Sequence, residues 1–153
     1  MFDYHIDEEK DVRPATHRKD VRIITQNVRG FRKSDMWEWL AAWRGIPMMH
    51  HPALIILQET HMQTEAERDE LIQRWQLLWG QPESASPLSY WSVGSHKEGG
   101  VGVLVFPDYQ QSVRPWNRHL WSTRTLGVQL NELHVLNLYA PSSKKQKREQ
   151  FFC

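Results

Sequence analysis

Residues 53–60 read Ala-Leu-Ile-Ile-Leu-Gln-Glu-Thr, and this stretch decides the fold of the chain. Its five apolar residues follow Pro52 and are too few for a free-standing helix, so they predict a short strand that is buried on both faces of a sheet. Polar residues come only at the end of the strand, where Gln58 and Glu59 stand side by side. Because α/β proteins bind ligands at the carboxyl ends of strands, the stretch predicts a functional carboxylate, Glu59, at the rim of the sheet.

A strand and a helix are expected before this stretch. Residues 21–28 (Val-Arg-Ile-Ile-Thr-Gln-Asn-Val) are β-branched and largely apolar, which predicts a strand that ends in a polar turn at Asn27. Ser34 is a typical capping residue, and apolar side chains recur at helical spacing over residues 35–44. These residues therefore predict a first strand–helix unit.

A second helix and a series of short strands are expected after the stretch. Thr64 and Glu67 have the spacing of a capping box, and apolar residues recur at helical spacing as far as Gly80. Five β-type runs follow, over residues 90–93, 101–106, 112–116, 125–130 and 134–139. The last two are joined so closely that they predict a hairpin. Two strand–helix units followed by antiparallel strands predict an α/β (α+β) fold with mixed, largely antiparallel sheets.

Composition and charge limit the classes to which the chain can belong. Its 153 residues suffice for one domain with a real core. Hydrophobic residues make up 40% and charged residues 24%, as in ordinary globular proteins, although eight tryptophans are many. The net charge of +1 excludes nucleic-acid binding by bulk charge, but it is compatible with a local phosphate-binding groove.

The two ends of the chain carry no strong targeting signal. Residues 1–20 alternate in charge and contain few apolar side chains, so they predict a mobile leader before a domain over residues 21–153. Cys153 is the only cysteine, which leaves no disulfide framework or cysteine-rich zinc site. No run approaches the length of a membrane span. We expect an intracellular protein, nuclear or cytoplasmic, without a membrane partner.

Three polar residues stand at the ends of predicted strands: Asn27, Glu59 and Tyr139. Magnesium prefers oxygen ligands, typically one or two carboxylates with water and substrate phosphate, and Glu59 suits this role. Asn27 could orient a water or a phosphate oxygen, and the Tyr139 hydroxyl could donate to a phosphate as charge develops on it. Taken singly, each also has an ordinary explanation as a turn, packing or solvated residue.

Other candidate sites are weaker. His61 lies just beyond Glu59 and could meet a phosphate, although a loop histidine without an identified partner is more often simply exposed. Residues 98–102 (Glu-Gly-Gly-Val-Gly) lack the Lys-Ser/Thr of a P-loop and enter a strand, so they predict a turn where backbone passes closely. The basic run over residues 144–148 is typical of a solvated helix face.

Four segments occur in a fixed order along the chain: 24–30 (Ile-Thr-Gln-Asn-Val-Arg-Gly), 54–60, 100–105 (Gly-Val-Gly-Val-Leu-Val) and 135–141 (Val-Leu-Asn-Leu-Tyr-Ala-Pro). Together they resemble the first motifs of the endonuclease/exonuclease/phosphatase superfamily. The Gln-Glu-Thr-His and Leu-Tyr-Ala-Pro segments look most like the endonuclease domain of non-LTR (LINE-type) retrotransposons. The resemblance extends from about residue 21 to the C-terminus.

The resemblance implies the N-terminal part of a four-layered α/β sandwich, in which two mixed sheets pack face to face with helices outside. It implies a hydrolase that uses Mg²⁺ or Mn²⁺ and an activated water to cleave phosphodiester or phosphomonoester bonds. The partner is then DNA, or RNA, bound through its phosphates. Residue by residue, Glu59 matches the metal ligand, Asn27 the active-site asparagine and Tyr139 the tyrosine that contacts the scissile phosphate.

The same resemblance implies a Gly-Asp-x-Asn motif and a later Asp-His pair, and neither occurs after Tyr139. We therefore expect a truncated domain with half of the site, weak magnesium binding and little or no activity. The loss of the second half should also leave the inner face of the first sheet exposed. A phosphatase or RNA nuclease of the same superfamily is an alternative, as is a non-catalytic nucleic-acid-binding or interaction remnant.

Overall fold

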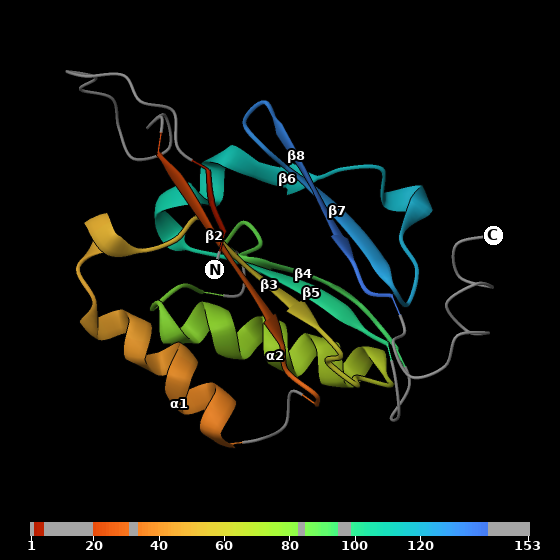
Figure 1. Cartoon of the computed structure of the whole chain (residues 1–153). Helices are drawn as coiled ribbons and strands as arrows, with labels where there is room; N and C mark the ends of the chain where they lie inside the picture. Colours follow the sequence, from red (N-terminus) through yellow and green to blue (C-terminus); the bar gives the residue numbers. More distant parts are fainter. Residues whose placement is uncertain (1, 5–19, 31–33, 83–84, 95–98, 141–153) are drawn as a thin grey trace.

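The computed structural model describes residues 2–4, 20–30, 34–82, 85–94 and 99–140, which form three layers (Figure 1). Two helices lie on one side, a five-stranded sheet lies in the middle, and a three-stranded sheet lies on the other side. We call these two sheets the large sheet and the small sheet. The arrangement is an α/β sandwich with mixed and antiparallel strands, which confirms the predicted fold class.

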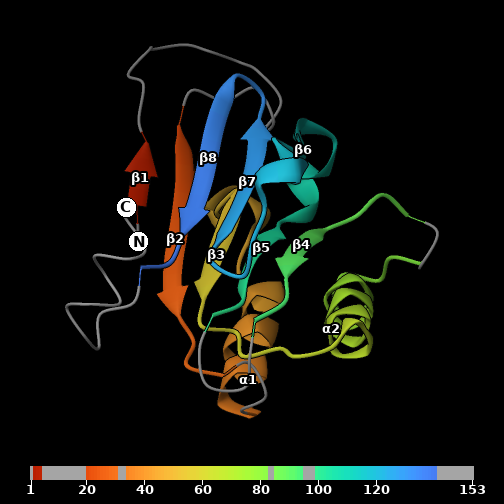
Figure 2. The same ribbon diagram turned by 90° about the vertical axis from the view of Figure 1, so that its right-hand side faces the viewer.

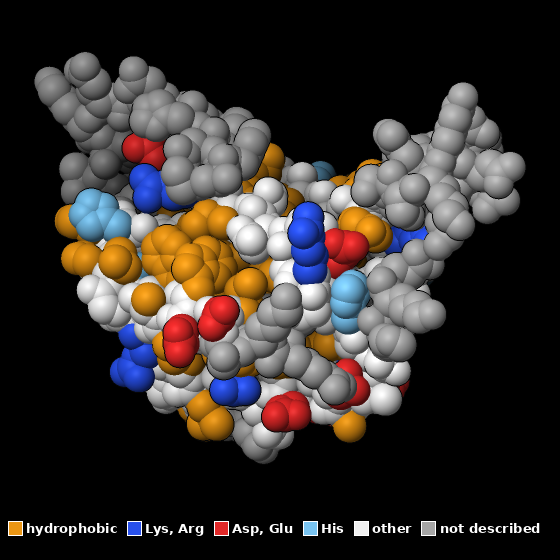
Figure 3. Space-filling view, turned by 60° about the horizontal axis from the view of Figure 1, so that its bottom comes forward, with side chains coloured by type: hydrophobic (Ala, Val, Ile, Leu, Met, Phe, Trp, Pro, Cys, Tyr) orange, Lys and Arg blue, Asp and Glu red, His pale blue; other side chains and the backbone are white. Residues whose placement is uncertain are grey.

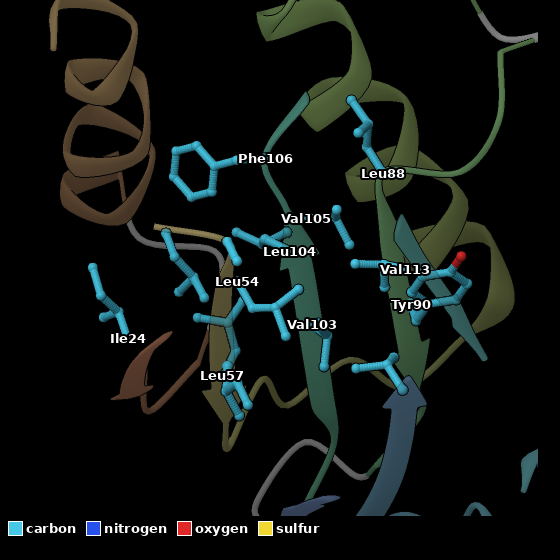
Figure 4. Packing of buried hydrophobic residues seen from close by; sticks show 14 of the residues in the cluster. Ile24, Leu54, Leu57, Leu88, Tyr90, Val103, Leu104, Val105, Phe106 and Val113 are labelled. Atoms are coloured by element: carbon cyan, nitrogen blue, oxygen red, sulfur yellow. The ribbon is translucent and has the colours of Figure 1, made fainter. Parts of the chain in front are cut away.

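The large sheet has the strand order β1-β2-β3-β5-β4. In this order its strands are Phe2–Tyr4, Val21–Asn27, Leu54–Gln58, Val101–Val105 and Ser89–Ser92. β3 pairs in parallel with β2 and antiparallel with β5, so the sheet is mixed. The apolar residues of β3 are buried at the centre of the core, together with neighbours from β5 (Figure 4). The stretch that decides the fold is therefore a central strand buried on both faces, as predicted.

Both predicted helices are present and cover one face of the large sheet. α1 spans Ser34–Ala42, and short 3₁₀ turns follow at Trp43–Gly45 and Met48–His50. α2 spans Glu65–Leu78. The Thr64 side chain accepts a hydrogen bond from the backbone N–H of Glu67 at 3.2 Å, which confirms the predicted cap. The first helix ends earlier than expected because the chain tightens into the 3₁₀ turn at Trp43.

An aromatic cluster joins the two helices to the large sheet. The rings of Trp43, Trp75 and Trp79 all contact the ring of Phe106, with centroids 5.5–5.6 Å apart. Trp75 is fully buried, and its indole N–H donates to the carbonyl oxygen of Val105 at 3.0 Å. Hydrophobic side chains also gather on the surface of this side of the molecule (Figure 3). The cluster accounts for part of the high tryptophan content, since the rings fill the layer between helices and sheet.

The small sheet has the order β6-β7-β8, formed by Val113–Pro115, Thr125–Leu130 and Leu133–Leu138. β7 and β8 form the predicted antiparallel hairpin, with Leu130 paired to Leu133. The run over 112–116 is shorter than expected because a 3₁₀ turn, Pro107–Ser112, takes up its first residue.

The inner face of the large sheet is not left bare, so that expectation was wrong. β7 and β8 pack against β3, β4 and β5, because the strands before residue 140 already form a second sheet. The exposed face is instead the outer face of the small sheet, where Leu136 and Leu138 are 58% and 43% exposed. Within the described residues, no helix covers that face.

The first residues of the chain also differ from expectation. Phe2–Tyr4 forms β1 and pairs antiparallel with β2, a strand that the sequence analysis did not expect, and the mobile leader over residues 1–20 stays a prediction. A run this short shows no periodicity that would reveal a strand in the sequence. Residues 5–19, Glu98, the basic run 144–148 and Cys153 lie outside the described residues. In the part of the chain that is described, no helix has the length and apolar character needed to cross a bilayer.

Candidate functional site

Strand pairing brings two of the predicted residues to one rim of the large sheet. β2 and β3 run parallel, and Asn27 is the partner of Gln58, the residue before Glu59. Their carboxyl ends therefore meet at the same edge. The small sheet supplies the third residue, because β8 crosses in front of the large sheet and ends one residue before Tyr139 (Figure 2).

A side-chain hydrogen bond joins Glu59 and Tyr139 across the two sheets. The Tyr139 hydroxyl donates to Glu59 Oε1 at 2.9 Å in a partly buried position. Among the described residues, no hydrogen bond reaches the other carboxylate oxygen of Glu59. One oxygen of the carboxylate is thus oriented by a phenol, and the other is available to a ligand.

The backbone at Glu59 forms a bulge that redirects its side chain. Gln58 pairs with Val101, and the N–H of Thr60 bonds to the carbonyl oxygen of Gly100 at 3.0 Å, so Glu59 has no partner on β5. Its φ is +54°, a left-handed conformation that is costly for a residue with a Cβ. The N–H of Gly30 holds the Glu59 carbonyl oxygen at 2.7 Å. Such strained residues concentrate at functional sites.

Asn27 shapes the neighbouring turn and is itself exposed. Its Oδ1 accepts a hydrogen bond from the backbone N–H of Arg29 at 3.1 Å. The chain then turns through Arg29 and Gly30, whose φ values are +47° and +99°. The amide of Asn27 therefore lies at the same rim as Glu59, and strand pairing rather than a direct bond to Glu59 places it there.

His61 packs against the turn at Gly30. Its Nδ1 lies 3.5 Å from the point that a Cβ on Gly30 would occupy. Its Nε2 is buried and has no hydrogen-bond partner among the described residues. Contact between His61 and a phosphate stays a prediction. Opposite this loop, Gly100 has a φ of +80° and a Cβ there would collide with Thr60 Oγ1, as expected for a turn where backbone passes closely.

The buried amide of Asn137 and the partly buried amide of Gln58 hold the small sheet against the site, and the sequence assigned neither of them this role. Asn137 is 1% exposed, and its Nδ2 donates to the carbonyl oxygens of Leu57 and Gly102 at 3.1 and 3.0 Å. Its Oδ1 accepts from Gln58 Nε2 at 3.0 Å. We call these three bonds the amide clamp. Because Asn137 is two residues before Tyr139 and Gln58 is next to Glu59, the clamp fixes the place where phenol and carboxylate meet.

The described residues offer few ligands for a metal ion. They contain no group of three or more His, Cys, Asp or Glu side chains that could hold one. The rim supplies one carboxylate, Glu59, with the exposed amide of Asn27 nearby. This donor set suits a magnesium ion that keeps most of its ligands as water and substrate phosphate.

Comparison with known proteins identifies the fold. No protein-family model and no curated protein matches the chain. Among solved structures, it is similar to the AP endonuclease LMAP from Leishmania major, with a TM-score of 0.54 and 16% identity over 86% of this chain. The aligned part shares the fold of an AP endonuclease. It spans 44% of that protein's chain, and at this identity the likeness shows the fold alone.

Proposed function

We propose that this chain is part of a metal-dependent DNA endonuclease of the kind found in non-LTR retrotransposons, and that Asn27, Glu59 and Tyr139 belong to its active site. The hydrogen bond between Tyr139 and Glu59 carries the proposal, because it places a phenol donor and a carboxylate from different sheets at one rim. The fold shared with an AP endonuclease and the four ordered sequence motifs support it.

In this proposal Glu59 would hold Mg²⁺ or Mn²⁺ through its carboxylate. When bound, the ion polarises a phosphoryl oxygen of the substrate and stabilises the charge that develops there. The Tyr139 hydroxyl keeps the carboxylate oriented, and in this proposal it would also donate to the substrate phosphate as charge develops there. The Asn27 amide donates to a phosphate oxygen from the neighbouring strand.

The chain carries only part of the machinery that the proposal requires. It spans 44% of the AP endonuclease chain, and no Gly-Asp-x-Asn motif or Asp-His pair follows Tyr139. Groups that act as one catalytic unit lose several powers of ten in rate when members are removed. We therefore propose that the 153 residues alone turn over little or no substrate and bind the metal weakly.

Two measurements on the purified chain test this proposal. Calorimetric titration with Mn²⁺ should show binding on the order of millimolar that is lost in Glu59→Gln and kept in Glu132→Gln, an exposed glutamate outside the site. Metal binding that survives Glu59→Gln would overturn the role of Glu59. Supercoiled plasmid with Mg²⁺ or Mn²⁺ should be nicked no faster by the chain than by its Glu59→Gln variant, and rates typical of a complete nuclease would contradict the expected loss of activity.

The proposal that this chain is part of a larger nuclease has a separate test. The DNA downstream of the codon for Cys153, translated in three frames, should encode the Gly-Asp-x-Asn motif and the Asp-His pair. A chain extended to include them should nick DNA, and Glu59→Gln should abolish the nicking. An extended chain that binds DNA equally well with and without Mg²⁺, and never cleaves it, would favour the non-catalytic nucleic-acid-binding alternative.

A further inference from the structure

A hollow lies at the edge of the large sheet that is farthest from β1. It is enclosed by α2, the edge strand β4 and the 3₁₀ turn Arg118–Leu120, and its volume is about 440 Å³. This volume lies in the range of small-molecule sites. None of the rim residues Asn27, Glu59 and Tyr139 lines it. We call it the β4 hollow.

Among the described residues, the charged side chains that line the β4 hollow are positive. They are Arg68 of α2 and Arg118, and no described Asp or Glu lines the hollow. Arg68 is partly neutralised by Asp69, which lies 3.3 Å away. Arg118 has no carboxylate partner among the described residues, and its guanidinium lies 5.2 Å from the centroid of the Trp121 ring. A donor-rich, positive hollow selects an anion, and Arg118 is the group best placed to bind it.

Tyr90 gives the β4 hollow a hydroxyl donor that is not bonded to a described residue. The residue is only 8% exposed, yet its hydroxyl makes no hydrogen bond to a described residue. Burial raises the pKa of Tyr90 and the charge of Arg118 opposes this rise, so the hydroxyl stays protonated at neutral pH. The hydroxyl is therefore free to donate to an acceptor that enters the hollow.

The remaining walls are mainly aromatic or apolar, with the polar residues Gln76 and Ser89 among them. The Trp121 ring, which meets the Tyr90 ring edge to face with centroids 6.3 Å apart, lines the hollow together with Ile72 and Pro87. Aromatic surfaces beside a cationic group are the usual platform for a nucleobase. We propose that the β4 hollow binds one nucleotide, with its phosphate on Arg118 and the Tyr90 hydroxyl and its base against Trp121. The nucleotide can be free or one unit of a nucleic-acid strand.

Calorimetric titration of the whole chain tests the proposal with three probes: deoxyadenosine 5′-monophosphate, inorganic phosphate and a single-stranded DNA dodecamer. We expect the mononucleotide to bind, and Arg118→Gln to weaken binding about tenfold or more through the loss of a charge-assisted contact. Arg114→Gln is the matched control, because Arg114 is an exposed arginine of β6 outside the hollow. Glu59→Gln should leave binding unchanged, which separates this proposal from the one for the rim.

The Tyr90→Phe variant tests whether the Tyr90 hydroxyl binds a ligand or only stabilises the fold. Because its hydroxyl has no protein partner, its removal should leave the stability of the chain unchanged or slightly raised while it weakens nucleotide binding several-fold. If only the dodecamer binds, and does so through Arg118 and Tyr90, the site takes a nucleotide within a strand. Phosphate binding as tight as that of the nucleotide, or binding that neither variant weakens, would overturn the proposal, as would the absence of binding by all three probes.

Discussion

The two faces of the large sheet are covered in different ways. On the helix side, the aromatic rings of Trp43, Trp75 and Trp79 surround Phe106, and Trp75 adds one hydrogen bond to the sheet. On the other side, the small sheet is fixed at the rim by the amide clamp of Asn137. Burial of the aromatic rings contributes much free energy through their apolar area, whereas the three directed hydrogen bonds fix one register of the small sheet on the large sheet.

This difference shows which of the two layers, the helices or the small sheet, positions residues at the rim. The helices contribute no side chain to the rim, and their contribution is stability. The small sheet contributes Tyr139, whose hydroxyl reaches Glu59 only when β8 sits in one position on β3. The buried apolar side chains of Leu126, Val128 and Leu130 already pack the small sheet into the core, so a polar network beside the site argues for a role in geometry as well as in stability.

Trp75→Ala should have the largest effect on stability. It removes a fully buried ring and its hydrogen bond to Val105, which should lower the free energy of unfolding by about 4 kcal/mol. Chemical denaturation measures the change. Leu77→Ala on the same helix removes a side chain that is 65% exposed and should change stability by no more than about 0.5 kcal/mol. Equal effects of the two variants would contradict the role of the buried aromatic rings in stabilising the helix side of the sheet.

Asn137→Leu should cost less, about 2–3 kcal/mol, because it leaves buried acceptors of Leu57 and Gly102 and the amide of Gln58 without their partner. Denaturation again gives the value. Leu136→Thr, one residue away on the exposed outer face, is the control and should be near neutral. If Asn137→Leu is as stable as the unmodified chain and still binds Mn²⁺ like it, the clamp does not position the site.

Glu59→Gly compared with Glu59→Ala should show the smallest effect. Both variants lose the bond to Tyr139, but glycine adopts the left-handed φ of +54° without penalty, so the glycine variant should be more stable by about 1 kcal/mol. The same pair at Glu38, an exposed position of α1, should show the reverse order by about 1 kcal/mol. An alanine variant as stable as the glycine variant would mean that the bulge stores no strain.

The elements and part of the rim could be predicted because local patterns determine them. The apolar run before Gln58 identified the central strand, and Thr64 with Glu67 identified the start of α2. The order of polar strand ends then placed Asn27 and Glu59 at one edge, since β2 and β3 are parallel.

The clamp and the bulge could not be predicted because they depend on contacts between distant residues. Asn137 lies in an alternating strand, and only the packing of the sheets shows that its side chain points inward. Glu59 adopts a conformation typical of glycine, and no residue near it marks the bulge. The β4 hollow was not expected for the same reason, because Tyr90 and Arg118 come together through tertiary structure.

The bond between Tyr139 and Glu59 also has a consequence for biosynthesis, because it joins residues 80 positions apart in the sequence. On a ribosome the large sheet can assemble as soon as β5 has emerged, whereas β8 and Tyr139 emerge later. Until then the nascent chain presents the apolar face that the hairpin will cover, a state that favours aggregation and chaperone binding. The contact between Glu59 and Tyr139 therefore forms only after β8 has emerged, and conditions that stall synthesis before β8 should yield insoluble chains rather than smaller folded ones.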